Sequence, residues 1–162
     1  MEYISVEKIN KNHYELLEKM MLEYIAELDI HKNTKTPNEI VLKVTKSMID
    51  KLDENRILQL VLDNGNSVGF YYAKIDRVGD KGLIFPNCGY IMEFFVRPDY
   101  RRKGIGRAMA TACENRLAEK GVPKIWLTAD SVTGIPFWLA CGYCDSGEIS
   151  YENNQKILIK EL

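Results

Sequence analysis

A chain of 162 residues is long enough for one domain with a substantial buried core, and we expect a single domain over residues 1–162. Its formal net charge of −1 argues against a nucleic-acid-binding protein, which usually carries a basic excess. No apolar run approaches the length of a membrane span, and no signal-peptide pattern follows Met1. We therefore expect a cytoplasmic protein that has neither nucleic acid nor membrane as a partner.

The first third of the chain predicts a strand over 3–9 and then two helices. Residues at helical spacing from about Asn12 give the first helix one buried stripe. The members of this stripe are Tyr14, Leu17, Met21, Tyr24 and Leu28. Its other face is acidic, and it either is solvated or attracts a cationic amine. The carboxylates of this face are Glu15, Glu18, Glu23 and Glu27.

The second helix has the clearest start signal in the chain. Thr36-Pro37-Asn38-Glu39 fits a capping box, with Thr36 as the N-cap, Pro37 in the first turn and Glu39 completing the box. The spacing predicts a buried stripe made of Val41, Val44, Met48 and Leu52.

The remainder of the chain predicts strands and helices in alternation. A turn at Asp63-Asn64-Gly65-Asn66 separates two strands and predicts a hairpin. Gly121, followed by Pro123, marks the end of a helix. The expected elements are strands over 57–62 and 68–75, a strand within 83–96, a helix over 105–120, a strand over 124–129, a helix over 133–140, and a closing hairpin of 144–152 and 156–162.

The most informative stretch runs from Tyr90 to Gly121. Tyr90–Val96 is an apolar run interrupted only by Glu93, and a basic glycine loop separates it from the next helix. The first turn of a helix has unpaired N–H groups and the positive end of the helix dipole, and glycine lets a ligand approach the backbone. Together these features predict a phosphate or pyrophosphate site. Its residues are Arg101, Arg102, Lys103, Gly104, Ile105, Gly106 and Arg107.

This loop resembles a known family motif. Arg101-Arg102-Lys103-Gly104-Ile105-Gly106 matches the Gln/Arg-x-x-Gly-x-Gly/Ala loop of the GNAT N-acetyltransferases, and the segment from Glu93 to Tyr100 is similar to that family's fourth strand and its exit. The resemblance implies an α/β fold of the acyl-CoA N-acyltransferase type. In that fold a mixed, mostly antiparallel sheet of about seven strands splays in the middle and is accompanied by about four helices.

The resemblance also implies a chemistry. Acetyl-CoA would be the acetyl donor, without a metal, and the acceptor would be a primary amine of a small molecule or peptide that attacks directly. Dimers are common in the family, so a homodimer is an open alternative. Glu93 would be the catalytic base, because a carboxylate inside an apolar strand has a raised pKa. The cofactor-binding residues outside the loop would be Phe94, Phe95, Val96, Ser131 and Trp138.

Two positions depart from the family pattern. Trp138 stands where a tyrosine usually serves as general acid, and Ser131 stands where asparagine is frequent. An indole N–H is no usable acid, which leaves open a non-catalytic CoA-binding sensor or partner domain on the same fold. Trp138 is then either a core residue or a contact of the thioester arm, and Glu93 is either a base or a structural carboxylate paired with a lysine or arginine. Cys141-Gly142-Tyr143-Cys144 resembles a redox or metal pair on spacing alone.

Overall fold

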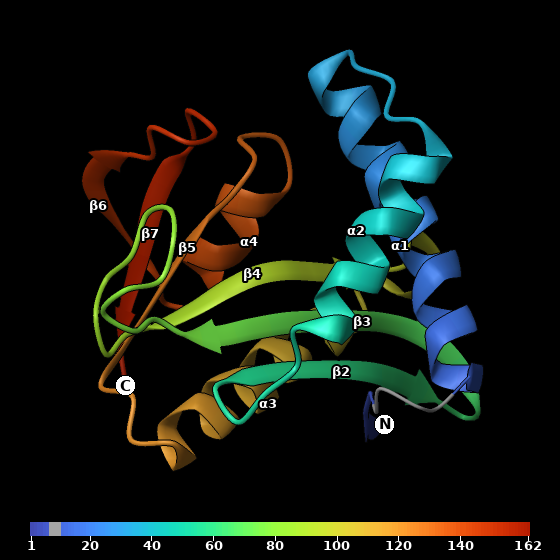
Figure 1. The fold of residues 1–162 in the computed structure, drawn as a ribbon, viewed down its shortest axis with the longest axis horizontal. Helices are drawn as coiled ribbons and strands as arrows, with labels where there is room; N and C mark the ends of the chain where they lie inside the picture. The colour runs from blue at the N-terminus through green and yellow to red at the C-terminus, as the bar shows by residue number, and fades with distance from the viewer. Residues whose placement is uncertain (7–10) are drawn as a thin grey trace. The chain divides into compact units, whose positions relative to one another are not determined.

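A computed structural model describes residues 1–6 and 11–162 (Figure 1). The predicted order of strands and helices is confirmed, while part of the strand expected over 3–9 lies outside the described residues. The elements are β1 Glu2–Ser5, α1 Lys11–Lys32, α2 Asn38–Asp50, β2 Arg56–Asp63, β3 Asn66–Ile75, β4 Gly89–Val96, α3 Ile105–Glu119, β5 Lys124–Thr128, α4 Gly134–Ala140, β6 Cys144–Ile149 and β7 Lys156–Glu161.

The strands form one mixed sheet of seven in the order β1-β2-β3-β4-β5-β7-β6. Antiparallel pairs join β1 to β2, β5 to β7 and β6 to β7, whereas β4 and β5 run parallel. Within the described part of the chain, the parallel register joins only Gly89 to Ile125 and Tyr90 to Trp126, which fits a sheet that opens in its middle. The predicted fold class is confirmed.

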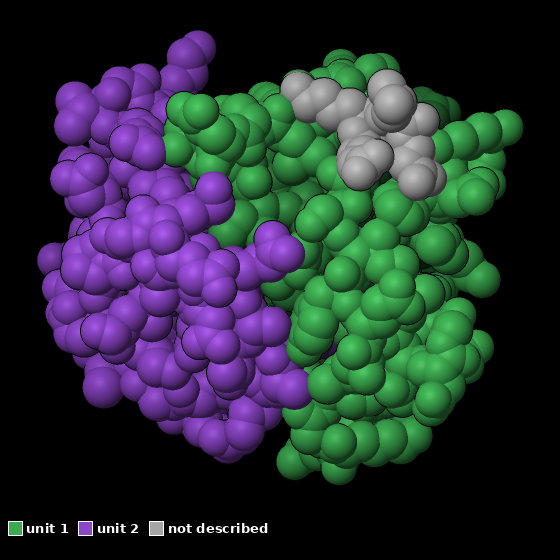
Figure 2. Space-filling view, turned by 90° about the horizontal axis from the view of Figure 1, so that it is seen from below, with its two compact units in different colours: residues 1–72, 93–106 green, residues 73–92, 107–162 purple. Residues whose placement is uncertain are grey.

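The described residues divide into two compact units, which Figure 2 shows in two colours. Unit 1 comprises residues 1–72 and 93–106, and unit 2 comprises 73–92 and 107–162. The single domain over 1–162 stays a prediction.

In unit 1, helices α1 and α2 lie on one face of the strands (Figure 1). Aromatic rings pack between the helices and the strands. The centre of the Tyr24 ring on α1 lies 5.9 Å from that of Phe70 on β3 and 5.5 Å from that of Phe95 on β4. The predicted hairpin turn is present, with φ of 50° at Asn64 and 79° at Gly65. Positive φ at both central residues is what a two-residue hairpin loop needs.

The start of α2 differs from the predicted capping box. The helix begins at Asn38, and Pro37, which precedes it, makes no side-chain cap. Asp29 at the end of α1 engages Thr36 instead, accepting its N–H at 2.6 Å and its hydroxyl at 2.9 Å. The capping box is therefore wrong, because a carboxylate on the preceding helix holds the residue that was expected to cap.

The buried stripe of α2 is also rotated from the prediction. Val44 is 43% exposed, so its place in the predicted stripe is wrong, and Thr45 is fully buried in its stead. The Thr45 hydroxyl donates to the carbonyl of Val41 at 2.9 Å, which satisfies the buried polar group within the helix.

In unit 2, the core gathers around Trp126 of β5. Its indole stacks on Tyr90 at 3.8 Å between ring centres, and its N–H donates to the buried Asp76 at 2.7 Å. Lys74 balances that carboxylate at 2.8 Å. Helix α3 ends as predicted, with Gly121 at φ 79° donating to the carbonyl of Ala118.

Across residues 1–6 and 11–162, no helix combines the length and apolar character needed to cross a membrane.

Candidate active site

The end of β4 places Glu93 on the helix-covered face of unit 1. Side chains alternate along a strand, so Glu93 and Phe95 share one face while Phe94 and Val96 occupy the other. Phe95 lies against the Tyr24 ring, and the Tyr24 hydroxyl donates a hydrogen bond to Glu93. Burial raises the pKa of Glu93 to about 7, against the opposing effects of the Tyr24 hydrogen bond and the Lys32 charge. A carboxyl group that titrates near neutral pH is suited to accept a proton from an amine.

If Glu93 were a structural carboxylate, it would be expected to pair with a lysine or an arginine. Among the described residues, Glu93 has no ion pair with a lysine or arginine within 4 Å. Tyr24 is the polar neighbour that sequence reasoning missed, because it was read only as one member of the buried stripe of α1. Its phenol hydroxyl, a polar group within that stripe, was the signal that could have identified it.

The chain leaves β4 through a short 3₁₀ helix, Pro98–Tyr100, and reaches α3 at Ile105. Positive φ values of 61° at Arg102 and 79° at Gly104 turn the backbone into the first turn of α3. A Cβ atom added at Gly104 would meet no heavy atom within 4 Å, so open space adjoins this glycine. An exposed loop that leads into the N-terminus of a helix of 15 residues has the donors that bind an anion.

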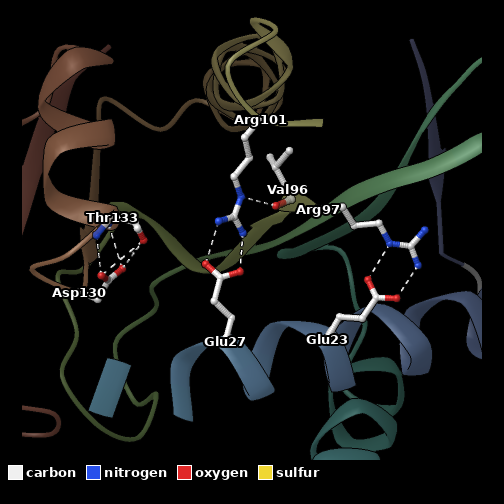
Figure 3. Close-up of polar contacts among 8 residues, drawn as sticks. Glu23, Glu27, Val96, Arg97, Arg101, Asp130 and Thr133 are labelled. Carbon is white, nitrogen blue, oxygen red and sulfur yellow. Dashed lines mark hydrogen bonds and ion pairs between the residues drawn. The ribbon is translucent and has the colours of Figure 1, made fainter. Parts of the chain in front are cut away.

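Two arginines after β4 are held by two glutamates of α1 (Figure 3). Arg97 donates through Nε to Glu23 at 2.7 Å and through Nη2 to the same carboxylate at 2.9 Å. Arg101 donates through Nη1 to Glu27 at 2.9 Å, through Nη2 to its other oxygen, and through Nε to the carbonyl of Val96 at 2.8 Å. Glu23 and Glu27 are thus paired with arginines, an arrangement that neither reading of the acidic face anticipated.

The other cations of the loop keep their charge unneutralised. Lys103 donates to the carbonyl of Asp99 at 2.8 Å, and in unit 2 Arg107 donates to the carbonyl of Ala140 at 2.8 Å. Both acceptors are uncharged. Arg102 is exposed and has no ion pair with a described residue. Within unit 1, Arg102 and Lys103 are the cations whose charge is suited to a phosphate.

The remaining predicted site residues belong to unit 2. Ser131 is exposed in the loop before α4, and that loop is organised by Asp130, which sequence reasoning did not single out. The Asp130 carboxylate accepts the backbone N–H of Thr133 at 2.8 Å (Figure 3). It also accepts the backbone N–H groups of Val132 at 2.9 Å and Gly134 at 3.0 Å.

Trp138 is buried, and its ring meets that of Tyr143 edge-on at 5.0 Å. This contact supports the packing role of Trp138, and its contact with a cofactor stays a prediction. Burial raises the pKa of the Tyr143 hydroxyl, which makes this phenol a poor proton donor. The adjacent Cys141 thiol also has a pKa raised by burial, the opposite of what a reactive cysteine pair needs.

The predicted residues therefore fall into two groups. Unit 1 holds Glu93, the strand residues 94–96 and the loop residues 101–106, which are continuous in the chain. Unit 2 holds Arg107, Ser131 and Trp138, of which Arg107 belongs to the first turn of α3. The described residues contain no group of three or more His, Cys, Asp or Glu side chains suited to hold a metal ion.

The model of the acetyltransferase (GNAT) family matches residues 15–143. Among solved structures, PaiA N-acetyltransferase from Thermoplasma acidophilum in complex with coenzyme A has 14% identity and a TM-score of 0.69, with all of both chains covered.

Two further structures are similar over nearly their whole length. An aminoglycoside 6'-N-acetyltransferase complexed with coenzyme A has 14% identity and a TM-score of 0.71, with 99% of this chain and 97% of that chain covered. A GNAT-family acetyltransferase from Staphylococcus aureus Mu50 has 16% identity and a TM-score of 0.74, with 99% of both chains covered.

No curated protein sequence matches. The structural likenesses show the fold. The family model covers most of the chain, from within α1 to the residues just after α4. The chain belongs to the acetyltransferase (GNAT) family.

Proposed function

We propose that this protein transfers the acetyl group of acetyl-CoA to a primary amine of a small molecule or peptide. The observation that carries the proposal is Glu93, a half-buried carboxyl group whose pKa is raised by burial to about 7. It lies on β4, the strand that precedes the glycine loop in the chain. Solved coenzyme A complexes among proteins of the same fold support the choice of donor.

The chain offers a group for each step of the reaction except the last. Backbone N–H groups of 102–107, with Arg102 and Lys103, would hold the pyrophosphate, and the edge of β4 at Phe94–Val96 would pair with the amides of the pantetheine arm. Glu93 would take a proton from the ammonium form of the acceptor. The neutral amine then attacks the acetyl carbonyl, and a backbone N–H near Val96 would stabilise the oxyanion.

The attacking nitrogen of that intermediate gives up its second proton to water. Collapse then breaks the bond between carbon and sulfur and releases the thiolate of CoA. Trp138 stands in place of the usual tyrosine, so water would supply the proton that the thiolate takes up. The proton accepted by Glu93 returns to solvent, and the products are an N-acetylated amine and CoA.

The proposed acceptor is a primary amine, and it need not carry several positive charges. Glu23 and Glu27, which the sequence offered as an attracting rim, are paired with arginines in unit 1. These pairs leave less negative charge on this helix face to attract a strongly cationic substrate.

A non-catalytic CoA-binding module is the second candidate, favoured by Trp138 at the tyrosine position. Release of free CoA thiol, measured with a panel of a polyamine, an aminoglycoside, a small monoamine and a peptide with a free N-terminus, separates the two. The enzyme reading expects amine-dependent thiol release that falls in Glu93→Gln. Saturable CoA binding with no amine-dependent release across the panel favours the second candidate.

A further inference from the structure

The two arginine–glutamate pairs of unit 1 share one geometry. Glu23 and Glu27 lie four residues apart on α1, one helical turn, and Arg97 and Arg101 lie four residues apart after β4. Each carboxylate is engaged by two nitrogens of one guanidinium, so the pairs form two parallel rungs between the same two segments (Figure 3). Bidentate pairs of this kind fix orientation as well as position. We call these four residues the arginine clamp.

The Arg101–Glu27 pair does more than neutralise charge. Arg101 also donates through Nε to the carbonyl of Val96, the last residue of β4, and its guanidinium lies 5.9 Å from the centre of the Phe95 ring. The side chain therefore closes a loop of five residues onto the strand that it follows. Its three nitrogens all have acceptors, and its side chain is only about a third exposed.

The Arg97–Glu23 pair secures the same end of β4. Arg97 donates through Nη1 to the carbonyl and hydroxyl of Ser67, at 2.7 and 2.8 Å, and its backbone N–H donates to the carbonyl of Val68 at 2.9 Å. The end of β4 is thus fastened to β3 and to α1 at once. Arg102, the residue that follows Arg101, has φ of 61°, a conformation uncommon for a residue other than glycine. A loop that contains such a residue needs anchored ends to keep its shape.

We propose that the arginine clamp holds the backbone of the glycine loop in its anion-binding conformation, so that Arg101 acts as a positioning residue and not as a ligand of the phosphates. The proposal rests on the proposed function for the identity of the anion, which is the pyrophosphate of CoA. Arg102 and Lys103 remain the charged ligands of unit 1, and Glu27 becomes a residue needed for cofactor binding although it lies on α1.

Exchanging the charges of Glu27 and Arg101 distinguishes a positioning role of Arg101 from direct contact with the phosphates. Glu27→Arg and Arg101→Glu each break the rung, and each should weaken CoA binding by about tenfold or more in calorimetric titration. The double variant restores a rung of reversed polarity, and it should recover most of the lost affinity. A double variant as weak as Arg101→Glu alone would overturn the proposal, since a glutamate at a phosphate contact repels the ligand whatever its partner.

If a charge-reversal variant fails to fold, a milder substitution at Arg101 distinguishes the same two roles, positioning residue and phosphate ligand. Arg101→Lys keeps a charge for a phosphate but loses the two-pronged contact and the bond to Val96. Positioning predicts weaker CoA binding and a raised KM for acetyl-CoA with kcat less affected, whereas unchanged affinity overturns it. Glu15→Gln is the matched control, since this glutamate of α1 is 60% exposed and pairs with Lys11 in an exposed contact.

The ligand-free protein distinguishes failure of this inference from failure of the proposed function. Unfolding of the wild type, the two single reversals and the double variant measures whether the charges of Glu27 and Arg101 are coupled, with no cofactor present. If the wild type binds no CoA, the proposed function fails, and the clamp is judged by this coupling alone. Effects that add without coupling would overturn the clamp.

Discussion

Tyr24 of α1 donates a hydrogen bond to the Glu93 carboxylate of β4, so a helix residue helps set the proton affinity of the proposed base. A hydrogen bond to the ionised form lowers a carboxyl pKa. Tyr24→Phe removes it and should raise the pKa of Glu93 above about 7, which moves the acidic limb of the kcat/KM profile to higher pH.

The profile should be measured from pH 5.5 to 9 on both proteins, roughly the range that brackets such a pKa. Tyr14→Phe on the same helix is the control, since Tyr14 has Glu18 as its neighbour and not Glu93. An acidic limb that does not move in Tyr24→Phe would contradict the link between the two residues.

Glu93→Gln should remove that limb altogether. A general base acts in its ionised form, so wild-type kcat/KM should fall as the pH drops below about 7. The glutamine variant has no carboxylate at any pH, so its deficit should be largest above pH 7 and should shrink below it. The amine's own titration is common to both proteins and cancels in their ratio. A ratio that stays constant with pH would remove Glu93 as the base.

The same substitution should change how stability depends on pH. Burial raises the pKa of Glu93 from 4.5 to about 7, so the folded state binds more protons than the unfolded state between these values. Stability contributed by this group therefore falls as the pH rises through that window, and the penalty is complete above it. Glu93→Gln should gain stability relative to the wild type between pH 5 and pH 8 in urea unfolding, roughly the two sides of that window. Parallel pH curves for the two proteins would show that Glu93 is not perturbed.

Trp138→Ala should destabilise the protein strongly, whatever its effect on the cofactor. The side chain is 5% exposed and packs against Phe137 and Tyr143, and truncation of a buried tryptophan costs about 3–5 kcal/mol. Leu139→Ala on the same helix is the control, because Leu139 is 47% exposed. The two variants should differ clearly in urea midpoint, and equal midpoints would contradict the packing role of Trp138.

Residue periodicity and turn chemistry were enough to predict the order of elements. The hairpin at Asn64-Gly65 and the helix end at Gly121 depend on backbone conformations that few residues adopt, so local sequence identifies them. The capping box failed because Thr36 had a competing partner in Asp29, and local pattern does not rank competitors. Val44 was misplaced because hydropathy favours valine over threonine, although the Thr45 hydroxyl is satisfied inside its own helix.

The glycine loop and Glu93 could be found from sequence because the strand, loop and helix are consecutive. The arginine clamp could not, because Glu27 and Arg101 are 74 residues apart and nothing near either residue indicates its partner. Tyr24 was missed for the same reason, since its hydroxyl meets Glu93 only once α1 lies on the sheet. Long-range polar pairs are decided by packing, and packing is not a local property of the chain.

The central claim is that acetyl-CoA binds at the loop before α3, and the melting temperature with and without acetyl-CoA tests it most directly. At 100 times Kd, binding stabilises the folded state by about 2.7 kcal/mol, a rise of roughly 5–10 °C for a chain of this size. Gly104→Asp and Gly104→Asn share the same backbone strain at φ 79° and differ only in charge. The account predicts a shift in the wild type, a smaller one in Gly104→Asn and none in Gly104→Asp. No shift in the wild type at millimolar acetyl-CoA, or an equal shift in all three proteins, would contradict it.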